Sequence, residues 1–419
     1  MRLSQSFART TKTISADEQS LNAKLLIQAG FIHKEMAGVY SYLPLGYRVL
    51  ENIKQIVREE MNALGAQELA MSALQPQENW QATGRWDDEL VDIWFKTELK
   101  NGQNIGLGWS HEEPMLLLAG KVAQSYRDLP IAVYQMQNKF RNELRSKSGI
   151  MRGREFLMKD MYHFARNLEE LEAFYTRVQE AYFKVFERVG LKKLTFLTYA
   201  SGGAFTDFSH EFQCLAESGE DTIYIDRSKK LAVNEEVYTD EVLNSLGLKK
   251  EELEQAKASE IGNIFNFKTT KAEQMGICFT DEQGRRQPMF LSSYGIGVSR
   301  LMGVIAELFN DDKGLIFPLS VAPATIYMIA IGGKETIKVS EKLYNTLTER
   351  GVAVIYDDRA VRPGEKFADA DLMGIPYRVV LNDSTSASGR YEVKGRTESE
   401  PKHMDLKALI ELSTSAMVK

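Results

Sequence analysis

The stretch from Lys139 to Phe164 gathers residue types that bind polyphosphates and stack on bases. Between Lys139 and Lys159 it has seven basic side chains and two acids, namely Lys139, Arg141, Arg145, Lys147, Arg152, Arg154 and Lys159 against Glu143 and Glu155. Its ends, 134–143 and 154–164, have the mixed polar and apolar character of strands, and 146–149 is typical of a turn. We therefore expect an antiparallel hairpin that brings Arg141 and Arg152 together, with Phe156 on the neighbouring strand.

Such a hairpin has two interpretations. Two guanidiniums can bind a polyphosphate bidentately, and an aromatic ring can stack on a base. A basic run is more often a solvated surface, however, so the hairpin alone does not decide between them.

Three other parts of the chain contain residues that could bind a substrate. Ser110 and Glu112 could accept hydrogen bonds from a cationic amine, although two acids before a proline commonly mark only a helix start. His210 and Glu211 follow a glycine-rich turn, where a lone His-Glu pair is usually structural. Arg300 falls in the first turn of a helix that opens at Gly295 and Gly297, and a helix N-terminus with a guanidinium is an anion site.

The bulk composition bounds the class of protein. At 419 residues, 43% hydrophobic and 26% charged, the chain should hold two or three soluble globular domains. Its net charge of −6 means that any nucleic-acid contact must use local basic surfaces. We find no apolar run long enough to span a membrane. The two cysteines, Cys214 and Cys278, suggest neither a disulfide framework nor a zinc site, and a reducing cytosol fits.

Periodicity and turn signals predict the elements that position these residues. We expect helices over 16–29, 47–64, 114–125, 168–189, 240–259 and 296–309. We expect further strands over 67–74, 195–199, 261–267, 275–280 and 288–294. From residue 321 onward, strands and helices alternate, which predicts a separate small α/β domain of about a hundred residues.

Two of these motifs resemble those of the class II aminoacyl-tRNA synthetases. Phe140-Arg141-Asn142-Glu143, a loop and Arg152-Gly153-Arg154-Glu155-Phe156 look like motif 2, and the run from Ser293 to Arg300 looks like motif 3. The stretches GWSHEEP, SHEFQCLAESGED, EIGNIF and DDRAVRPGEKFADADLMGIP are similar to the bacterial-type prolyl-tRNA synthetase family over nearly the whole chain.

The resemblance implies an α/β fold class with an α+β catalytic domain. Residues 1–320 would form the class II antiparallel sheet flanked by helices, and 321–419 the anticodon-binding domain. Motifs 1, 2 and 3 would lie at about 40–76, 134–164 and 288–309. Ser72 stands where the family's motif 1 strand usually ends in proline. The segment 226–259 would be the short remnant at the place where many relatives insert an editing domain, which predicts no editing in cis.

The resemblance also implies residue roles. Arg141 would grip the α-phosphate of ATP and the substrate carboxylate, Arg152 and Arg300 the γ-phosphate. Phe156 would stack on adenine and Glu143 accept its amine. The remaining nucleotide contacts would come from Glu211, which is also a candidate Mg²⁺ ligand, and from Gln213, Gly295 and Gly297. The proline pocket would comprise Ser110, Glu112, Arg141, Met158, His210 and Ser292. Arg145 and Lys147 would contact the tRNA acceptor stem, and Arg359, Arg362 and Lys366 the anticodon.

The implied reaction is activation of L-proline by ATP, followed by transfer to the 3′ end of the proline-specific tRNA (tRNA-Pro). It needs Mg²⁺ with ATP but neither zinc nor an organic cofactor, and no His or Cys nucleophile. The family also implies a homodimer through motif 1 and a cytoplasmic location, despite a basic start faintly like a transit peptide. It also leaves room for a separate trans-editing protein. One alternative is a threonyl or histidyl enzyme, and the threonyl enzyme would need zinc ligands. The other is a regulatory tRNA-binding paralogue, and such paralogues usually lose the three arginines.

Overall fold

The computed structural model describes residues 1–14, 18–144, 148–203, 205–206 and 208–415. It divides into two compact units, each described here by itself. The first comprises Met1–Met36, Tyr40–Ile53 and Met302–Lys419, and the second comprises Ala37–Val39 and Lys54–Leu301. The candidate residues of the hairpin and of the glycine-rich helix start all belong to the second unit.

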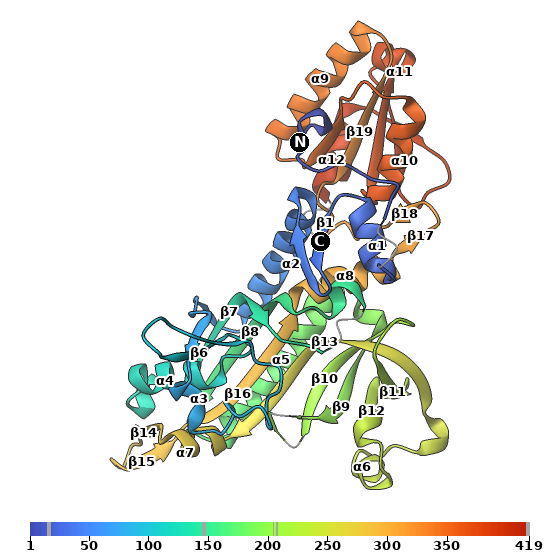
Figure 1. Ribbon diagram of the computed structural model, residues 1–419. Coiled ribbons are helices and arrows are strands. Elements are labelled where there is room, and N and C mark those ends of the chain that lie inside the picture. The colour runs from blue at the N-terminus through green and yellow to red at the C-terminus, as the bar shows by residue number, and fades with distance from the viewer. Residues whose placement is uncertain (15–17, 145–147, 204, 207, 416–419) are drawn as a thin grey trace. The chain divides into compact units, whose positions relative to one another are not determined.

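The second unit is built on a nine-stranded sheet (Figure 1). Its order is β10 (Phe208–Leu215), β9 (Thr195–Ser201), β12 (Leu231–Asn234), β11 (Asp221–Asp226), β13 (Glu254–Lys268), β16 (Phe290–Gly297), β8 (Glu155–Ala165), β7 (Ile131–Phe140) and β3 (Gln67–Glu68). The long strand β13 pairs with β11, β10 and β16, so β9 to β13 form a closed ring of pairings. Around this sheet lie β4 (Leu74–Pro76), β5 (Lys96–Glu98), β6 (Asn104–Leu107), β14 (Cys278–Thr280) and β15 (Arg286–Pro288).

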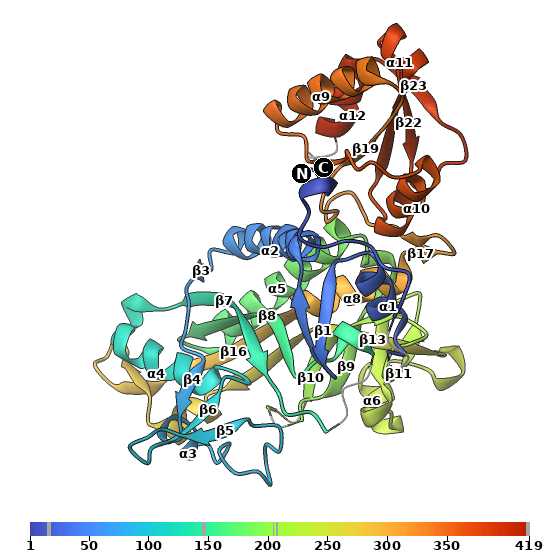
Figure 2. The same ribbon diagram turned by 45° about the horizontal axis from the view of Figure 1, so that its top comes forward.

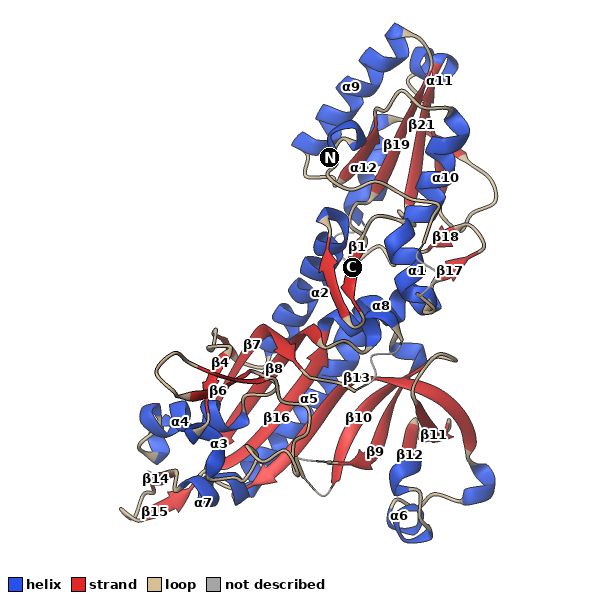
Figure 3. Ribbon diagram, viewed as in Figure 1, coloured by secondary structure: helices blue, strands red, loops and turns tan. Residues whose placement is uncertain are grey.

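Helices cover the two faces of this sheet differently (Figure 3). The amphipathic helix α5 (Leu168–Arg188) packs along β8, β13 and β16 on one face. On the other face, α4 (Glu112–Val122) and α7 (Thr270–Met275) enclose an apolar cluster at one end of the sheet. The rest of that face stays available for the candidate site. The short helices α3 (Glu78–Gln81) and α6 (Asp240–Ser245) lie in connections between strands.

Alternation along the strands decides which side chains face the site. On β8, His163 stacks on Phe174 of α5, whereas Tyr162 hydrogen-bonds the backbone N–H of His111 from the opposite face. Since successive side chains of a strand point to opposite faces, Phe156 and Met158 share the face of Tyr162.

The first unit contains a five-stranded sheet of order β20 (Val354–Asp357), β19 (Ile326–Ile331), β21 (Tyr377–Asn382), β22 (Tyr391–Gly395) and β23 (Lys402–Met404) (Figure 2). The core between this sheet and its helices includes Ile326, Leu343, Val379 and Leu409. The helices are α9 (Lys334–Glu349), α10 (Pro363–Met373), α11 (Asp383–Ser388) and α12 (Leu406–Ser415). Parallel pairing of β19 with β20 and β21 confirms the predicted alternating α/β character. The N-terminal part adds α1 (Leu21–Gln28), β1 (Ile32–Met36) and β2 (Val39–Tyr42), and the chain before the sheet adds β17 (Asn310–Asp311) and β18 (Gly314–Leu315).

Two helices run from one unit into the other along the chain, α2 (Pro44–Ala63) and α8 (Val298–Leu308). In the described part of the chain, no helix combines the length and the apolar character needed to cross a bilayer.

The predicted elements are confirmed where the pattern of apolar and polar residues extends over many residues. The hairpin forms as β7 and β8 with Lys139 opposite Phe156, and the helix predicted over 168–189 is α5. Three predictions are wrong. The helix over 240–259 stops at Ser245, the strand over 67–74 splits into β3 and β4 in different sheets, and 275–280 is strand only from Cys278.

Candidate functional site

A pocket in the second unit collects the three arginines that the sequence singled out. It lies between the base of the β7–β8 hairpin, β13 and the start of α8. Its lining residues are Arg141, Glu143, Ser148, Met151, Arg152, Glu220, Asp221, Ser259, Glu260 and Arg300. The hairpin therefore meets a segment about 150 residues further along the chain, as an anion-binding pocket would require.

Arg141 is the cation in this pocket whose guanidinium has no hydrogen-bond partner among the described residues. Its backbone N–H donates to the carbonyl of Arg154 at 2.8 Å, which fixes the residue at the base of the loop. No described residue accepts a hydrogen bond from its guanidinium, and its Nε is buried without a partner. The guanidinium carbon lies 5.2 Å from the centre of the Phe156 ring. An unpaired, partly buried guanidinium is costly, so a ligand anion is the natural partner.

The charges around Arg141 come from two sides of the pocket. Burial lowers the pKa of Arg141, Glu260 raises it and Arg300 lowers it, while Glu143 and Glu112 raise it as well. Glu260 and Arg300 belong to the side predicted to hold the polyphosphate (the polyphosphate side), and Glu112 to the side predicted to hold an amine. Arg141 therefore lies where two substrates would meet.

Arg152 and Arg300 are held by acids and carbonyls. Arg152 donates from Nη1 to Glu220 at 2.6 Å and from Nη2 to Glu143 at 3.0 Å. Arg300 donates from Nε to the carbonyl of Met151 at 2.6 Å, and from Nη1 to the carbonyl of Glu260 and its carboxylate. These contacts hold both guanidiniums at the pocket wall. Glu143, predicted to accept an adenine amine, instead binds Arg152 here.

The pocket face of β16 is glycine-lined. A Cβ added at Gly295 would lie 2.6 Å from Oδ1 of Asn263, and one at Gly297 would lie 3.0 Å from Cβ of Arg300. Phe156 and Met158 lie on the same face of the neighbouring strand, with Gly297 paired to Met158. The glycines therefore let the side chains of Asn263 and Arg300 pack closely against β16, beside the strand that carries Phe156.

Two predicted pocket residues lie on the other side of the sheet. His210 contacts the hydroxyl of Tyr175 on α5 through Nδ1 at 2.8 Å. Ser292 and Tyr294 share a hydrogen bond at 2.7 Å between their hydroxyls, and the Tyr294 ring packs on Phe174 of α5. The structure thus does not bring His210 or Ser292 to the amino-acid pocket. Alternation along β16 puts Ser293 on the pocket face instead.

Ser110 and Glu112 form a buried pair at the start of α4. The hydroxyl of Ser110 donates to Oε2 of Glu112 at 2.6 Å, and Nη1 of Arg85 donates to the same oxygen at 3.1 Å. No described residue donates to Oε1 of Glu112. Since α4 begins at Glu112, the helix-start interpretation of the two acids also holds. Sequence reasoning missed Arg85, although a lone arginine among Trp80, Trp86, Trp94 and Trp109 was visible.

An acidic cluster borders the polyphosphate side. Nε2 of Gln213 donates to Glu211 at 2.8 Å and to Asp221 at 2.6 Å. Burial raises the pKa of Glu211 well above its usual range, and the carboxylate of Glu260 raises it further. Glu220, Asp221 and Glu260 were missed in the sequence, although ESGED and EIGNIF contain them. Among the described residues, no group of three His, Cys, Asp or Glu is placed to hold a metal ion by itself.

The pKa of Glu211 gives a pH-dependent prediction. A carboxyl with a higher pKa in the folded than in the unfolded chain destabilises the fold as pH rises above the unfolded pKa. Glu211→Gln mimics the protonated form, so it should stabilise the ligand-free protein at pH 8 and much less at pH 5. Urea unfolding at the two pH values measures this, with Glu180→Gln on the exposed side of α5 as control. An equal gain at both pH values, or a loss at pH 8, would refute it.

The three predicted anticodon residues flank the start of α10 in the first unit. Arg359 donates to Asp357 at 2.8 Å and to Asp369 at 2.7 Å, and Lys366 donates to the carbonyl of Asp357 at 2.9 Å. These two side chains thus tie α10 to β20. Arg362, the residue before α10, is exposed. Arg145 and Lys147, predicted to contact the acceptor stem, lie outside the described residues.

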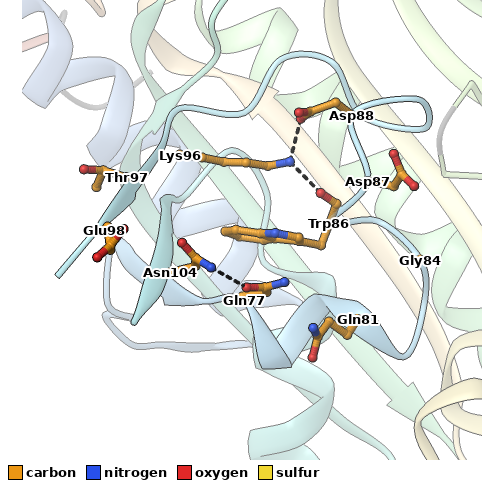
Figure 4. Close-up of a pocket in the computed structure, with 10 residues that line it drawn as sticks. All are labelled: Gln77, Gln81, Gly84, Trp86, Asp87, Asp88, Lys96, Thr97, Glu98 and Asn104. Atoms are coloured by element: carbon orange, nitrogen blue, oxygen red, sulfur yellow. Dashed lines mark hydrogen bonds and ion pairs between the residues drawn. The ribbon is translucent and has the colours of Figure 1, made fainter. Parts of the chain in front are cut away.

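A second, larger cavity of about 750 Å³ lies over β5 and β6 (Figure 4). Lys96 lies 4.8 Å from the centre of the Trp86 ring, and it donates to Asp88 at 2.5 Å. This cavity contains none of the predicted site residues, and its lysine is already paired. The arginine-lined pocket is therefore the candidate site.

Comparison with known families identifies both parts of the chain. Residues 95–309 match the family described as tRNA synthetase class II core domain (G, H, P, S and T), and residues 325–414 match the anticodon binding domain. The predicted boundary at 320 falls between these ranges. The match confirms the predicted fold class.

Similar proteins of known name cover the whole length. The proline–tRNA ligase of Rickettsia akari (strain Hartford) is 34% identical over 98% of this chain and 99% of its own. That of Wolbachia sp. subsp. Drosophila simulans (strain wRi) is 36% identical over 98% and 99%. Near-complete mutual coverage shows that this chain has no large insertion relative to these two ligases, in agreement with the short segment predicted at 226–259.

Solved structures agree on the fold. Prolyl-tRNA synthetase from Cryptosporidium parvum, complexed with halofuginone and AMPPNP, superposes with a TM-score of 0.76 at 18% identity, covering 95% of this chain and 79% of that one. The same enzyme complexed with L-proline and AMP gives 0.74 at 18% identity, covering 95% and 77%. With its synthetase core, its anticodon-binding domain and full-length relatives above 30% identity, the chain belongs to the proline–tRNA ligase family of class II aminoacyl-tRNA synthetases.

Proposed function

We propose that the arginine-lined pocket of the second unit activates L-proline with ATP, and that the chain then transfers the prolyl group to the 3′ end of tRNA-Pro. The observation that supports this most is the guanidinium of Arg141, which has no hydrogen-bond partner among the described residues, lies 5.2 Å from the centre of the Phe156 ring and interacts electrostatically with Glu112 and Glu260. A cation there neutralises the charge that develops when a carboxylate attacks a phosphate.

In the first step, the proline carboxylate attacks the α-phosphorus in line and pyrophosphate leaves. Positioning and charge neutralisation dominate such transfers, so no protein nucleophile is needed. Arg141 contacts both the carboxylate and the α-phosphate. Arg152 and Arg300 hold the leaving phosphates, for which Arg152 exchanges its acid partners. Phe156 stacks on adenine, above the glycines of β16.

Mg²⁺ would neutralise phosphate charge when it enters with ATP. The chemistry of the acids fits it, because a hard cation that bridges phosphates needs only one or two protein carboxylates. Glu260 lines the pocket and raises the pKa of Glu211, so these two are the residues that would hold the ion, with Gln213 positioning Glu211.

Proline enters on the other side of Arg141. Its secondary ammonium donates to Oε1 of Glu112, which has no partner among the described residues, while Ser110 holds Oε2. Met158 and Ser293 on the pocket face of β8 and β16 bound the ring. The ammonium of proline thus pairs with the Glu112 carboxylate, and the carboxylate of proline pairs with the Arg141 guanidinium.

The tRNA contacts are a separate part of the proposal. Arg145→Ala and Lys147→Ala should spare adenylate formation and lower tRNA charging, because loop cations would contact acceptor-stem phosphates and not ATP. Each lost phosphate contact should also lower the salt dependence of charging, by about one unit of the log–log slope. Pyrophosphate exchange and charging assays over a salt series measure both. Equal damage to the two steps would contradict the acceptor-stem role.

Further proposals follow from family membership. The chain acts as a homodimer through motif 1, in the cytoplasm, and any hydrolysis of mischarged tRNA comes from a separate trans-editing protein. Within the C-terminal domain, Arg362 is the candidate for direct anticodon contact, since Arg359 and Lys366 are engaged with Asp357.

Amino-acid-dependent ATP–pyrophosphate exchange across the twenty amino acids tests the function. Exchange should be strongest with proline. No exchange with any amino acid would favour a regulatory tRNA-binding paralogue, and exchange only with threonine or histidine would assign the pocket to another class II enzyme.

A further inference from the structure

Arg85 is a buried cation at the edge of the amino-acid pocket. Its side chain is 2% exposed, and its Nη1 donates to Glu112 at 3.1 Å and to Glu113 at 3.0 Å. On the far side of the cluster, Lys271 donates to Glu113 at 2.8 Å. Two cations thus balance two carboxylates in a buried environment, where an unbalanced charge would be costly.

Aromatic rings fix the plane of this guanidinium. Its central carbon lies 4.4 Å from the ring centre of Trp109, 4.7 Å from that of Phe205 and 5.2 Å from that of Trp80. Nε and Nη2 are buried without partners, so the aromatic contacts and the two carboxylates together hold the group. A planar guanidinium suits such a site, and a lysine ammonium does not reproduce it.

The consequence concerns one oxygen of Glu112. Arg85 and Ser110 both bind Oε2, and rotating the carboxylate would break a buried ion pair. We propose that Arg85 is a positioning residue, which fixes the Glu112 carboxylate so that Oε1 meets the secondary ammonium of the substrate. This inference rests on the ammonium-binding role proposed for Glu112.

Arg85→Lys tests this positioning role, because lysine keeps the positive charge but lacks the planar guanidinium that packs against the aromatic rings. In proline-dependent pyrophosphate exchange, KM for proline should rise about tenfold while KM for ATP changes less than about twofold. KM does not depend on the fraction of enzyme that is folded, so a loss of stability alone would not produce this split.

Lys271→Met is the matched control, since Lys271 belongs to the same buried cluster but contacts Glu113 and not Glu112. It should lower the unfolding temperature and leave KM for proline within about twofold. An equal rise of KM for proline in both variants would overturn the proposal, because the cluster would then act only through general structure.

A double-mutant cycle separates this inference from the proposed function. Glu112→Gln should raise KM for proline, and adding Arg85→Lys to it should raise KM little further, because Arg85 acts through Glu112. If Glu112→Gln has no effect, the proposed ammonium site is wrong. If it has the effect and Arg85→Lys has none, or if the two effects simply add, only the role of Arg85 is wrong.

Glu113→Gln keeps the proposal testable if Arg85→Lys does not fold. It removes the negative charge but keeps an amide oxygen that can accept from Nη1 of Arg85, and it leaves the contact between Arg85 and Glu112, so KM for proline should stay within about twofold. A tenfold rise would contradict a specific action of Arg85 on Glu112.

Discussion

Replacing Arg141 with alanine is expected to abolish proline-dependent ATP–pyrophosphate exchange. Among the described residues, the guanidinium is the pocket's cation without a hydrogen-bond partner, and we propose that it lies where the charge of the attacking carboxylate and of the α-phosphate builds up. Removing one such donor costs about 100- to 1,000-fold in kcat in enzymes that stabilise an oxyanion, and in the proposed role Arg141 contacts two anions at once. We therefore expect a loss of about 1,000-fold or more in kcat/KM for proline.

The same substitution should not destabilise the protein. Arg141 donates no side-chain hydrogen bond to any described residue, and burying its charge is unfavourable. Thermal unfolding should therefore be unchanged or slightly higher in temperature. Arg127→Ala is the control and should keep full activity, because Arg127 is exposed and its side chain hydrogen-bonds only Tyr126 among the described residues. Exchange within tenfold of normal in Arg141→Ala would refute the assignment.

Arg300→Ala is expected to have the second largest effect, and on the other substrate. Arg300 stands on the polyphosphate side, so kcat/KM for ATP should fall by about 100-fold or more, while KM for proline stays within about twofold. Arg300→Lys should not restore activity, because an ammonium cannot reproduce the contacts that the guanidinium makes from Nε and Nη1.

In contrast to Arg141, Arg300 also supports the fold. Its bonds to the carbonyls of Met151 and Glu260 join the hairpin loop to β13, so Arg300→Ala should lower the unfolding temperature. Arg227→Ala, which removes an exposed pair with Glu254, is the control for the loss of a surface arginine. A similar rise of KM for both substrates would argue against separate sides of the pocket.

The sequence predicted the parts of the site that depend on short-range pattern. The strands on either side of the basic loop have clear ends, and the glycines before Arg300 mark a helix start, so Arg141, Arg152, Phe156 and Arg300 were found without coordinates. Their convergence followed from the resemblance of the two motifs and not from any pattern along the chain.

The direction of side chains on the strands was harder to predict. Side chains alternate between the two faces of a sheet, so an error of one residue assigns a side chain to the wrong face. His210 and Ser292 were assigned to the pocket one residue away from Glu211 and Ser293, which have the opposite orientation. In the pairing of β10 with β13, a bulge at Ile261 shifts the parity of β13, and a single sequence does not show such a bulge.

Tertiary contacts decided the other errors. Residues 254–258 have a helix-favouring composition, yet they pair with β11 and extend β13 to fifteen residues. Arg85 and Glu260 were missed for a similar reason. Arg85 pairs with Glu112 and Glu113, and Glu260 pairs with Arg300. These partners are distant in the sequence, so a local motif does not reveal them.

The most direct test is a structure of the protein with a non-hydrolysable analogue of prolyl-adenylate. We predict that the Arg141 guanidinium lies within hydrogen-bond distance of both the prolyl carbonyl oxygen and the group that replaces the α-phosphate, with the ring ammonium on Oε1 of Glu112. An analogue bound with Arg141 still unpaired, or bound outside the arginine-lined pocket, would contradict the account.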